Sequence, residues 1–201
     1  MANTRSFTIG DSVNKAWEIT KKNIWFLLGV EFLAFFVPRI VLAGTPRFAQ
    51  PGMMLLSFVY QLIVGIGMIV IALKLLDGRK PVWKELYTHY DLFINYFVAV
   101  LLMGLCVFLG FIALVLPGIY IALRLSLTTF YVVDRKLGPV DALKASWAAT
   151  SGNVLHLLGL IIVYWGIMLL GALALGVGVF VAIPVVLLTN ASIYRQLSGG
   201  K

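Results

Sequence analysis

One pattern occurs twice in the sequence: KAWEITKKNIWFLLG at residues 15–29 and ASWAATSGNVLHLLG at residues 145–159. Aligned without gaps, the two copies share a tryptophan, a threonine, an asparagine and the triplet Leu-Leu-Gly. In each copy, a segment with polar edges and helical spacing runs directly into a long apolar run. The pattern therefore predicts a repeated unit, in which one helix lies on a membrane surface and the next helix enters the membrane.

The composition places the chain among α-helical membrane proteins that cross the bilayer several times. Of its 201 residues, 61% are hydrophobic and 12% are charged, whereas a soluble domain has roughly 45–50% apolar and about 25% charged residues. The apolar residues form runs long enough to cross a bilayer, and the alternating segments of about ten residues that mark a β-barrel do not occur. The net charge of +8 comes from basic residues beside the apolar runs, so we expect no nucleic-acid partner.

The apolar runs predict an all-α membrane protein with six transmembrane helices, arranged as three hairpins that each follow an amphipathic interfacial helix on the cytoplasmic side. The expected spans are residues 24–43, 53–76, 96–116, 119–133, 155–175 and 180–194, and the expected surface helices are residues 1–23, 82–97 and 140–152. Pro117-Gly118 and Gly176-Val177-Gly178 are the expected turns of the last two hairpins.

These elements make a single integral membrane domain, residues 1–201, with units of about 1–76, 77–134 and 135–201. The near-repeat suggests three units around a pseudo-threefold axis, although six hairpin helices could also pack in another way.

The basic residues predict the orientation. All but three of the 16 Lys and Arg residues fall on one side of the predicted spans; Arg39 and Arg47 fall on the other side, and Arg124 lies inside the fourth span. Cytoplasmic loops of membrane proteins carry the excess of Lys and Arg. We therefore expect both termini and all three surface helices to be cytoplasmic.

Aromatic and basic side chains of the surface helices are candidates for contact with lipid headgroups. Tryptophan favours the membrane interface, and lysine is attracted to anionic lipids. The candidates are Trp17, Lys21, Lys22, Trp83, Lys84, Lys144 and Trp147. The alternative for the first helix is an ordinary amphipathic helix packed on a protein, and a partner protein could be a second copy of the chain or another membrane protein.

Glu31 and Arg124 are the two charges placed deep within the predicted spans. A charge near the bilayer centre costs about 2.5–3.5 kcal/mol on insertion scales, so each needs a partner, water or a route to the interface. The backbones of the two residues should differ in depth by roughly 10 Å, and Gln61 could help to bridge them. One interpretation is a polar centre of Glu31, Gln61 and Arg124 that binds a substrate or couples ions; the other is a structural ion pair, or an arginine that reaches the interface.

The sequence offers no constellation for catalysis or metal binding. The eight acidic residues are scattered along the chain, His89 and His156 stand alone, and Cys106 is the single cysteine. Metal-assisted hydrolysis needs clustered carboxylates or histidines. We therefore expect no catalytic residues, no metal and no cofactor.

Three stretches carry a resemblance to a known family: LPGIYIALRL at residues 116–125, VDALKASW at residues 140–147, and Gly152-Asn153. They resemble the membrane domain associated with glycerophosphoryl diester phosphodiesterases and the related uncharacterised bacterial multi-pass proteins. The resemblance implies a six-span protein of the bacterial cytoplasmic membrane. The soluble catalytic barrel of the phosphodiesterases has no counterpart here, so the resemblance brings no catalytic residues.

These observations favour a non-enzymatic, lipid-associated accessory or membrane-organising module. The alternative is a small secondary transporter with Glu31, Gln61 and Arg124 along its path, in which Pro184 and the short fourth span mark irregular helices. A membrane-embedded enzyme that acts on lipid headgroups is a third hypothesis.

Overall fold

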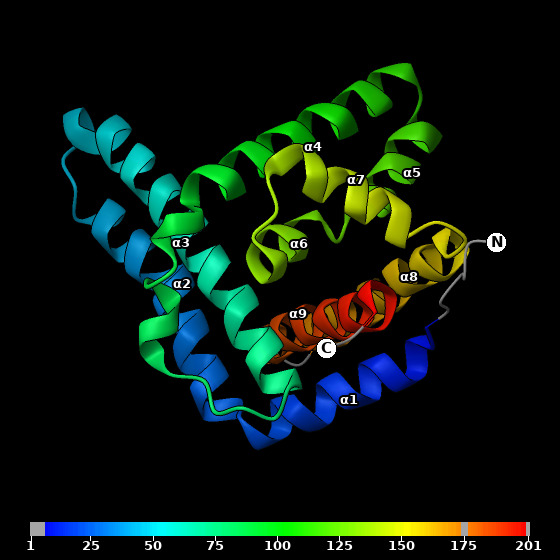
Figure 1. Cartoon of the computed structure of the whole chain (residues 1–201). Helices are drawn as coiled ribbons and strands as arrows, with labels where there is room; N and C mark the ends of the chain where they lie inside the picture. Colours follow the sequence, from blue (N-terminus) through cyan, green and yellow to red (C-terminus); the bar gives the residue numbers. More distant parts are fainter. Residues whose placement is uncertain (1–6, 174–176, 200–201) are drawn as a thin grey trace.

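The computed structural model describes residues 7–173 and 177–199, which form α-helices and short 3₁₀ turns and contain no β-strand (Figure 1). The elements in chain order are α1 (Ile9–Lys22), α2 (Ile24–Ala43), η1 (Arg47–Ala49), α3 (Gln50–Leu76), η2 (Trp83–Leu86), η3 (Tyr90–Leu92), α4 (Phe93–Ala113), α5 (Val115–Leu125), α6 (Thr128–Arg135), α7 (Pro139–Ala149), α8 (Val154–Leu173) and α9 (Val177–Ser198).

Six helical segments within the described residues are long and apolar enough to cross a membrane. They are Ile24–Ala43, Arg47–Leu76, Trp83–Ala113, Val115–Arg135, Val154–Leu173 and Gly178–Ser198. Helices span membranes because they satisfy every backbone hydrogen bond internally. The predicted all-α class with six spans is confirmed, and the chain is a multi-pass membrane protein.

The second surface segment differs from the continuous helix that its spacing predicted. The chain forms the two short turns η2 and η3 before α4 begins. The backbone of η2 packs directly on α3: a Cβ atom at Gly67 would lie 2.4 Å from Leu86 Cα. This contact buries Glu85 and Leu86, and Lys74 of α3 pairs with Glu85. Tertiary packing against a glycine therefore overrides the helical period in this segment.

The turn between α4 and α5 also differs from the prediction. The chain turns at Leu114, which has an extended backbone (φ −173°, ψ 160°), and Pro117 and Gly118 lie inside α5. Proline is tolerated there because the first turn of a helix has no partner for its backbone N–H groups. Gly118 fits under the ring of Phe111, since a Cβ atom would lie 2.6 Å from Phe111 Cγ. Gly176 of the other predicted turn lies outside the described residues, and Val177 and Gly178 belong to α9.

The predicted fourth span is two helices instead of one. The break between α5 and α6 falls at Ser126 and Leu127. By contrast, α9 continues through Pro184 without interruption. Of the two spans expected to be irregular, the structure interrupts the fourth and leaves the one with Pro184 continuous. The fourth span is not short, because it covers Val115–Arg135, 21 residues, instead of residues 119–133.

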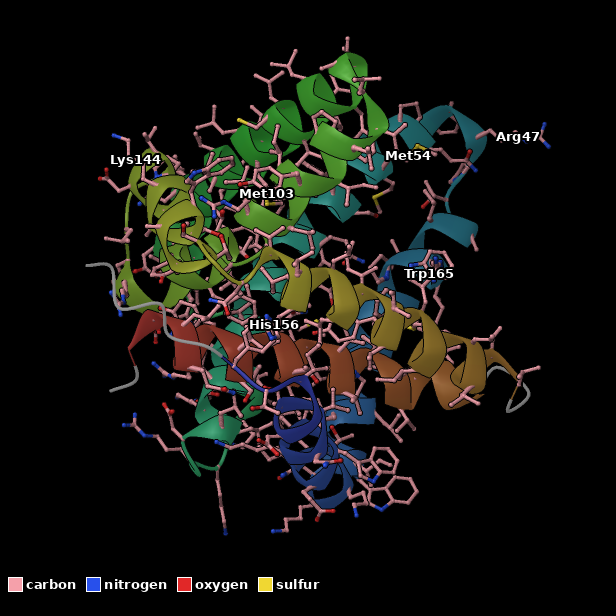
Figure 2. The ribbon with its side chains drawn as sticks, turned by 90° about the vertical axis from the view of Figure 1, so that its right-hand side faces the viewer. Arg47, Met54, Met103, Lys144, His156 and Trp165 are labelled. Atoms are coloured by element: carbon pink, nitrogen blue, oxygen red, sulfur yellow. The ribbon has the colours of Figure 1, made fainter. Side chains whose placement is uncertain are left out.

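The hairpins extend from a common base in different directions. The α2–α3 and α4–α5 hairpins point to the upper left and upper right of Figure 1, and the α8–α9 hairpin extends toward the right of Figure 2. The returning helices α3, α6 and α9 meet at the base. There Arg195 Nη2 lies 2.8 Å from Asp77 Oδ2 and Arg195 Nη1 lies 3.1 Å from Asp134 Oδ2.

Tyr194 completes this junction of the returning helices, which we call the base cluster (Asp77, Asp134, Tyr194 and Arg195). Its hydroxyl donates a hydrogen bond of 2.8 Å to Asp134 Oδ2. Its ring is fully buried and stacks on Phe130 of α6. One arginine and one tyrosine of α9 thus hold the ends of α3 and α6 together.

Each surface segment packs against the hairpin of the unit before it, with the third unit counted before the first. Helix α1 contacts α9, η2 contacts α3, and α7 contacts α4, α5 and α6. The units are therefore interlocked in a cyclic order along the base, so that each hairpin is covered by a neighbour's surface segment.

Candidate functional site

The junctions at the ends of α1 and α7 are built alike. Thr20 and Thr150 are fully buried, and each hydroxyl donates to the carbonyl four residues earlier, that of Ala16 at 2.8 Å and that of Ser146 at 2.8 Å. The next helix then starts after an asparagine, Asn23 or Asn153, whose carbonyl accepts the first hydrogen bond. The shared residues therefore fix the step from surface helix to membrane helix in both copies.

The glycine of each Leu-Leu-Gly triplet lies under the surface segment of the next unit. A Cβ atom at Gly29 would lie 2.5 Å from Trp83 Cη2, and one at Gly159 would lie 3.4 Å from Ile9 Cδ1. The ring of Trp83 also lies 4.7 Å from that of Phe26, between ring centroids. Small residues allow close approach between elements in membrane proteins. Here the two glycines allow the surface segments of the next units to pack directly on the membrane helices.

The seven candidate lipid-contact residues all lie on the surface segments. Trp17, Trp83 and Trp147 are 44%, 43% and 39% exposed, so each ring is partly packed and partly available to lipid. Lys22, Lys84 and Lys144 are exposed, while Lys21 forms a salt bridge with Glu18 and lies 5.7 Å from the Trp17 ring centroid. In the part of the chain that the structure describes, no ion pair involves Lys22, Lys84 or Lys144.

Two apolar pockets lie beside the two copies of the repeat. The α1 pocket has a volume of about 470 Å³ and lies between α1, α8 and α9, and the α7 pocket has about 480 Å³ and lies between α4, α5 and α7. The α1 pocket is lined by Val13, Asn14, Trp17, Ile167, Leu170, Gly171, Gly178, Val181, Ala182 and Val185. The α7 pocket is lined by Cys106, Ile121, Leu125, Leu143, Lys144, Trp147 and Ala148.

The surface helices contribute matched positions to these pockets. In the alignment of the two copies, Val13 corresponds to Leu143, Asn14 to Lys144 and Trp17 to Trp147. A pocket of this size with apolar walls and few polar groups is typical of a site for a small or extended apolar ligand. The repeat thus forms the same kind of site twice, on two different hairpins.

Arg124 lies against the second copy of the repeat. Its side chain is 6% exposed, and its Cζ atom is 4.4 Å from the ring centroid of Trp147 and 5.7 Å from that of Tyr120. A guanidinium over an aromatic face is stabilised by the ring's quadrupole. Its Nε has no hydrogen-bond partner within the described residues, so the aromatic rings are its main neighbours.

The backbone of Arg124 is held by α7 as well. Ser146 Oγ donates to the Arg124 carbonyl at 2.9 Å and accepts from the Leu127 N–H at 3.2 Å. The Thr150 hydroxyl, which donates to the Ser146 carbonyl, also lies within hydrogen-bond distance of the Arg124 carbonyl, at 3.1 Å. The break between α5 and α6 leaves backbone groups without helical partners, and α7 supplies the partners.

Glu31 is apart from Arg124. Its side chain is 1% exposed, and neither carboxylate oxygen has a hydrogen-bond partner among the described residues. Of the interpretations that the sequence left open, an ion pair between the two charges is not formed in the described residues, and Arg124 packs against Trp147 and Tyr120 instead. Gln61 does not connect the two charges. Its Nε2 donates a hydrogen bond of 3.0 Å to the carbonyl of Ala34 on α2, about one turn from Glu31.

The residues of the base cluster were not among the candidates from the sequence. One sequence feature could have identified the two aspartates: Asp77 and Asp134 both end an apolar run, and both precede an Arg-Lys pair and a proline. Their common partner, Arg195, comes from a segment that lacks this pattern. Within residues 7–173 and 177–199, no group of three or more His, Cys, Asp or Glu side chains could hold a metal ion.

Comparison with known proteins gives relatives without an assigned role. The chain is 27% identical over 148 residues to the uncharacterized protein Mb2590 of Mycobacterium bovis and to the uncharacterized protein MT2637 of Mycobacterium tuberculosis. The uncharacterized protein Rv2560 of Mycobacterium tuberculosis is 26% identical over the same length. The matches cover 72% of this chain and 44% of each relative, so the chain spans less than half the length of these relatives. No family model and no solved structure matches.

Proposed function

We propose that this protein is a non-enzymatic, lipid-associated module of the bacterial cytoplasmic membrane, which binds phospholipids beneath its surface helices. The observation that carries the proposal is the pair of matched pockets, each with apolar walls and a half-exposed tryptophan, Trp17 or Trp147. Acyl chains suit such walls, and an indole ring at the rim favours the depth of the lipid headgroups.

The distribution of charge supports the same proposal. Exposed lysines accompany the surface segments, as on proteins that attract the anionic lipids of the cytoplasmic leaflet. In this proposal the base faces the cytoplasm together with both termini. The resemblance to the membrane domain of the phosphodiesterases remains a prediction; it agrees with a role at lipids that requires no catalytic residue.

Lipid retention tests the proposal. We would purify the wild-type chain and the double variant Trp17→Ala/Trp147→Ala in a mild detergent and count bound phospholipids by native mass spectrometry. We expect the double variant to lose phospholipid that the wild type retains. Trp165→Ala is the control, because Trp165 is 75% exposed and lines neither pocket. Equal retention by all three proteins would contradict the proposal.

A second candidate function is secondary transport coupled to protons. The buried carboxylate of Glu31, which has no hydrogen-bond partner among residues 7–173 and 177–199, favours it. Such intramembrane acids commonly mark proton relays. Proteoliposomes loaded with a pH-sensitive dye and energised by a potassium gradient would report proton flux. Transport predicts a lower flux for Glu31→Gln than for the wild type, whereas identical fluxes would leave lipid binding as the better account.

A further inference from the structure

The α7 pocket differs from the α1 pocket in charge. Lys144 lines the α7 pocket at the position where Asn14 lines the α1 pocket. Lys144 is exposed and has no salt bridge among the described residues, although Asp141 lies one turn earlier on α7. The rim of the α7 pocket therefore carries a positive charge that forms no ion pair in the described residues.

Arg124 adds a second positive charge behind the wall of the same pocket. The ring of Trp147 lines the pocket, and the Arg124 guanidinium lies 4.4 Å from the centroid of that ring. No carboxylate pairs with Arg124 in the described part of the chain. Because Arg124 is buried, water screens its charge less than that of an exposed group, and its field adds to the attraction of the exposed Lys144 for an anion.

The pocket runs from the charged rim into the hairpin. Leu143 and Lys144 come from the surface helix α7, whereas Cys106 comes from α4, about 20 Å beyond the start of that helix at 1.5 Å per residue. Ile121 and Leu125, one turn apart on α5, connect the two ends. Figure 2 shows Lys144 at the opposite side of the molecule from Arg47, which precedes α3 at the turn of the first hairpin.

We infer that the α7 pocket binds an anionic phospholipid, with the phosphate beside Lys144 and an acyl chain extending along Leu125 and Ile121 toward Cys106. The inference rests on the proposed function and adds selection by headgroup charge. The α1 pocket has no cation at the matched position, so it binds lipid without that selection. Arg124 holds the Trp147 wall and raises the positive potential at the site.

Cys106 provides a direct readout, because it lines the pocket and is the single cysteine of the chain. We would measure the rate of its alkylation by N-ethylmaleimide in detergent, with added phosphatidylglycerol or phosphatidylcholine. Phosphatidylglycerol should slow the reaction of the wild type at lower concentration than phosphatidylcholine does. Lys144→Asn should weaken this protection by about five-fold in lipid concentration, which corresponds to about 1 kcal/mol for one basic residue near an anionic surface.

The matched control is Lys80→Asn, which removes an exposed lysine that lies between α3 and η2, does not line the pocket and is not among the lipid-contact residues. In this variant, phosphatidylglycerol should protect Cys106 at the same lipid concentration as in the wild type. Equal protection by both lipids would overturn the charge selection and leave the proposed function standing. Absence of protection by either lipid would overturn both. Protection that needs no added lipid and rises with protein concentration would assign the pocket to a second copy of the chain and overturn the inference.

Discussion

The surface helices α1 and α7 carry the same pattern but meet different partners. Helix α1 lies against α9, which is continuous, whereas α7 lies against the break between α5 and α6. Where α1 has the fully buried Ala16, α7 has the fully buried Ser146, whose hydroxyl bonds to backbone groups on both sides of the break. The two copies of the repeat therefore keep the tryptophan and the threonine–asparagine junction. The buried residue that faces the neighbouring hairpin, Ala16 or Ser146, differs according to whether the backbone that it covers is continuous or broken.

The largest expected effect follows from this substitution. Ser146→Ala leaves the buried Leu127 N–H without its partner, which should lower the free energy of unfolding by about 2 kcal/mol. The reciprocal change, Ala16→Ser, should cost much less, because a serine hydroxyl in a helix can bond to its own backbone. Unfolding of both variants in detergent by a denaturant would measure the difference. Equal losses would show that the hydroxyl at the break contributes nothing specific.

The matched glycines give a smaller contrast. Gly29→Ala places a methyl group 2.5 Å from the Trp83 ring, and the required shift should cost about 1 kcal/mol. At Gly159 the nearest atom is 3.4 Å away, so Gly159→Ala should be close to neutral. Melting temperatures and the fluorescence of Trp83 would report both the cost and the displaced ring. If Gly159→Ala were the more damaging change, the assigned close approach at Gly29 would be wrong.

The smallest difference concerns charge on the exposed face. Glu18 of α1 corresponds to Ala148 of α7, and the hydrogen bond and positive charge of Lys21 lower the pKa of Glu18 below its usual 4.5. A lowered folded-state pKa stabilises the helix above the usual value, and the contribution is lost as the pH falls through the lowered value. Hydrogen exchange, corrected for intrinsic rates, should therefore speed up in α1 and not in α7 below about pH 4.5.

Glu18→Gln removes the titrating group and is the control for this pH dependence. In the variant, exchange in α1 should no longer depend on pH in that range. An unchanged pH dependence would assign the effect to another group on the elements that contact α1.

The spans could be predicted from the sequence because each is decided by its own residues. The run from Ile24 to Ala43 coincides with α2, and the runs 53–76, 119–133 and 180–194 lie within the spans found. The run 96–116 was placed too far along the chain, because α4 ends at Ala113, and the last two residues of the run 155–175 lie outside the described residues. The turn at Leu114 and the two turns η2 and η3 could not be predicted in this way. They depend on Gly118 under Phe111 and on Gly67 under η2, which are contacts between elements.

The candidate site was partly visible. Trp17 and Trp147 were recognised as interfacial residues, but the pockets that they line require hairpins from other units. Arg124 was recognised as a buried charge that needs a partner, yet its neighbours are Trp147 and Tyr120 instead of Glu31. The free-energy cost of inserting a charge into the membrane predicts that Arg124 needs a partner. Which residues take that role depends on how the helices pack.

By itself, the sequence determined the class of this protein, the number of apolar runs that can cross a membrane and the matched surface helices. In lipid, a helix satisfies its own backbone, so hydrophobic length and local pattern suffice for these features. Only the tertiary structure decided that each surface segment covers the preceding hairpin, that the fourth span breaks where Ser146 can bridge it, and that Arg124 packs on Trp147. Those features depend on close contacts between distant residues, which no local pattern specifies.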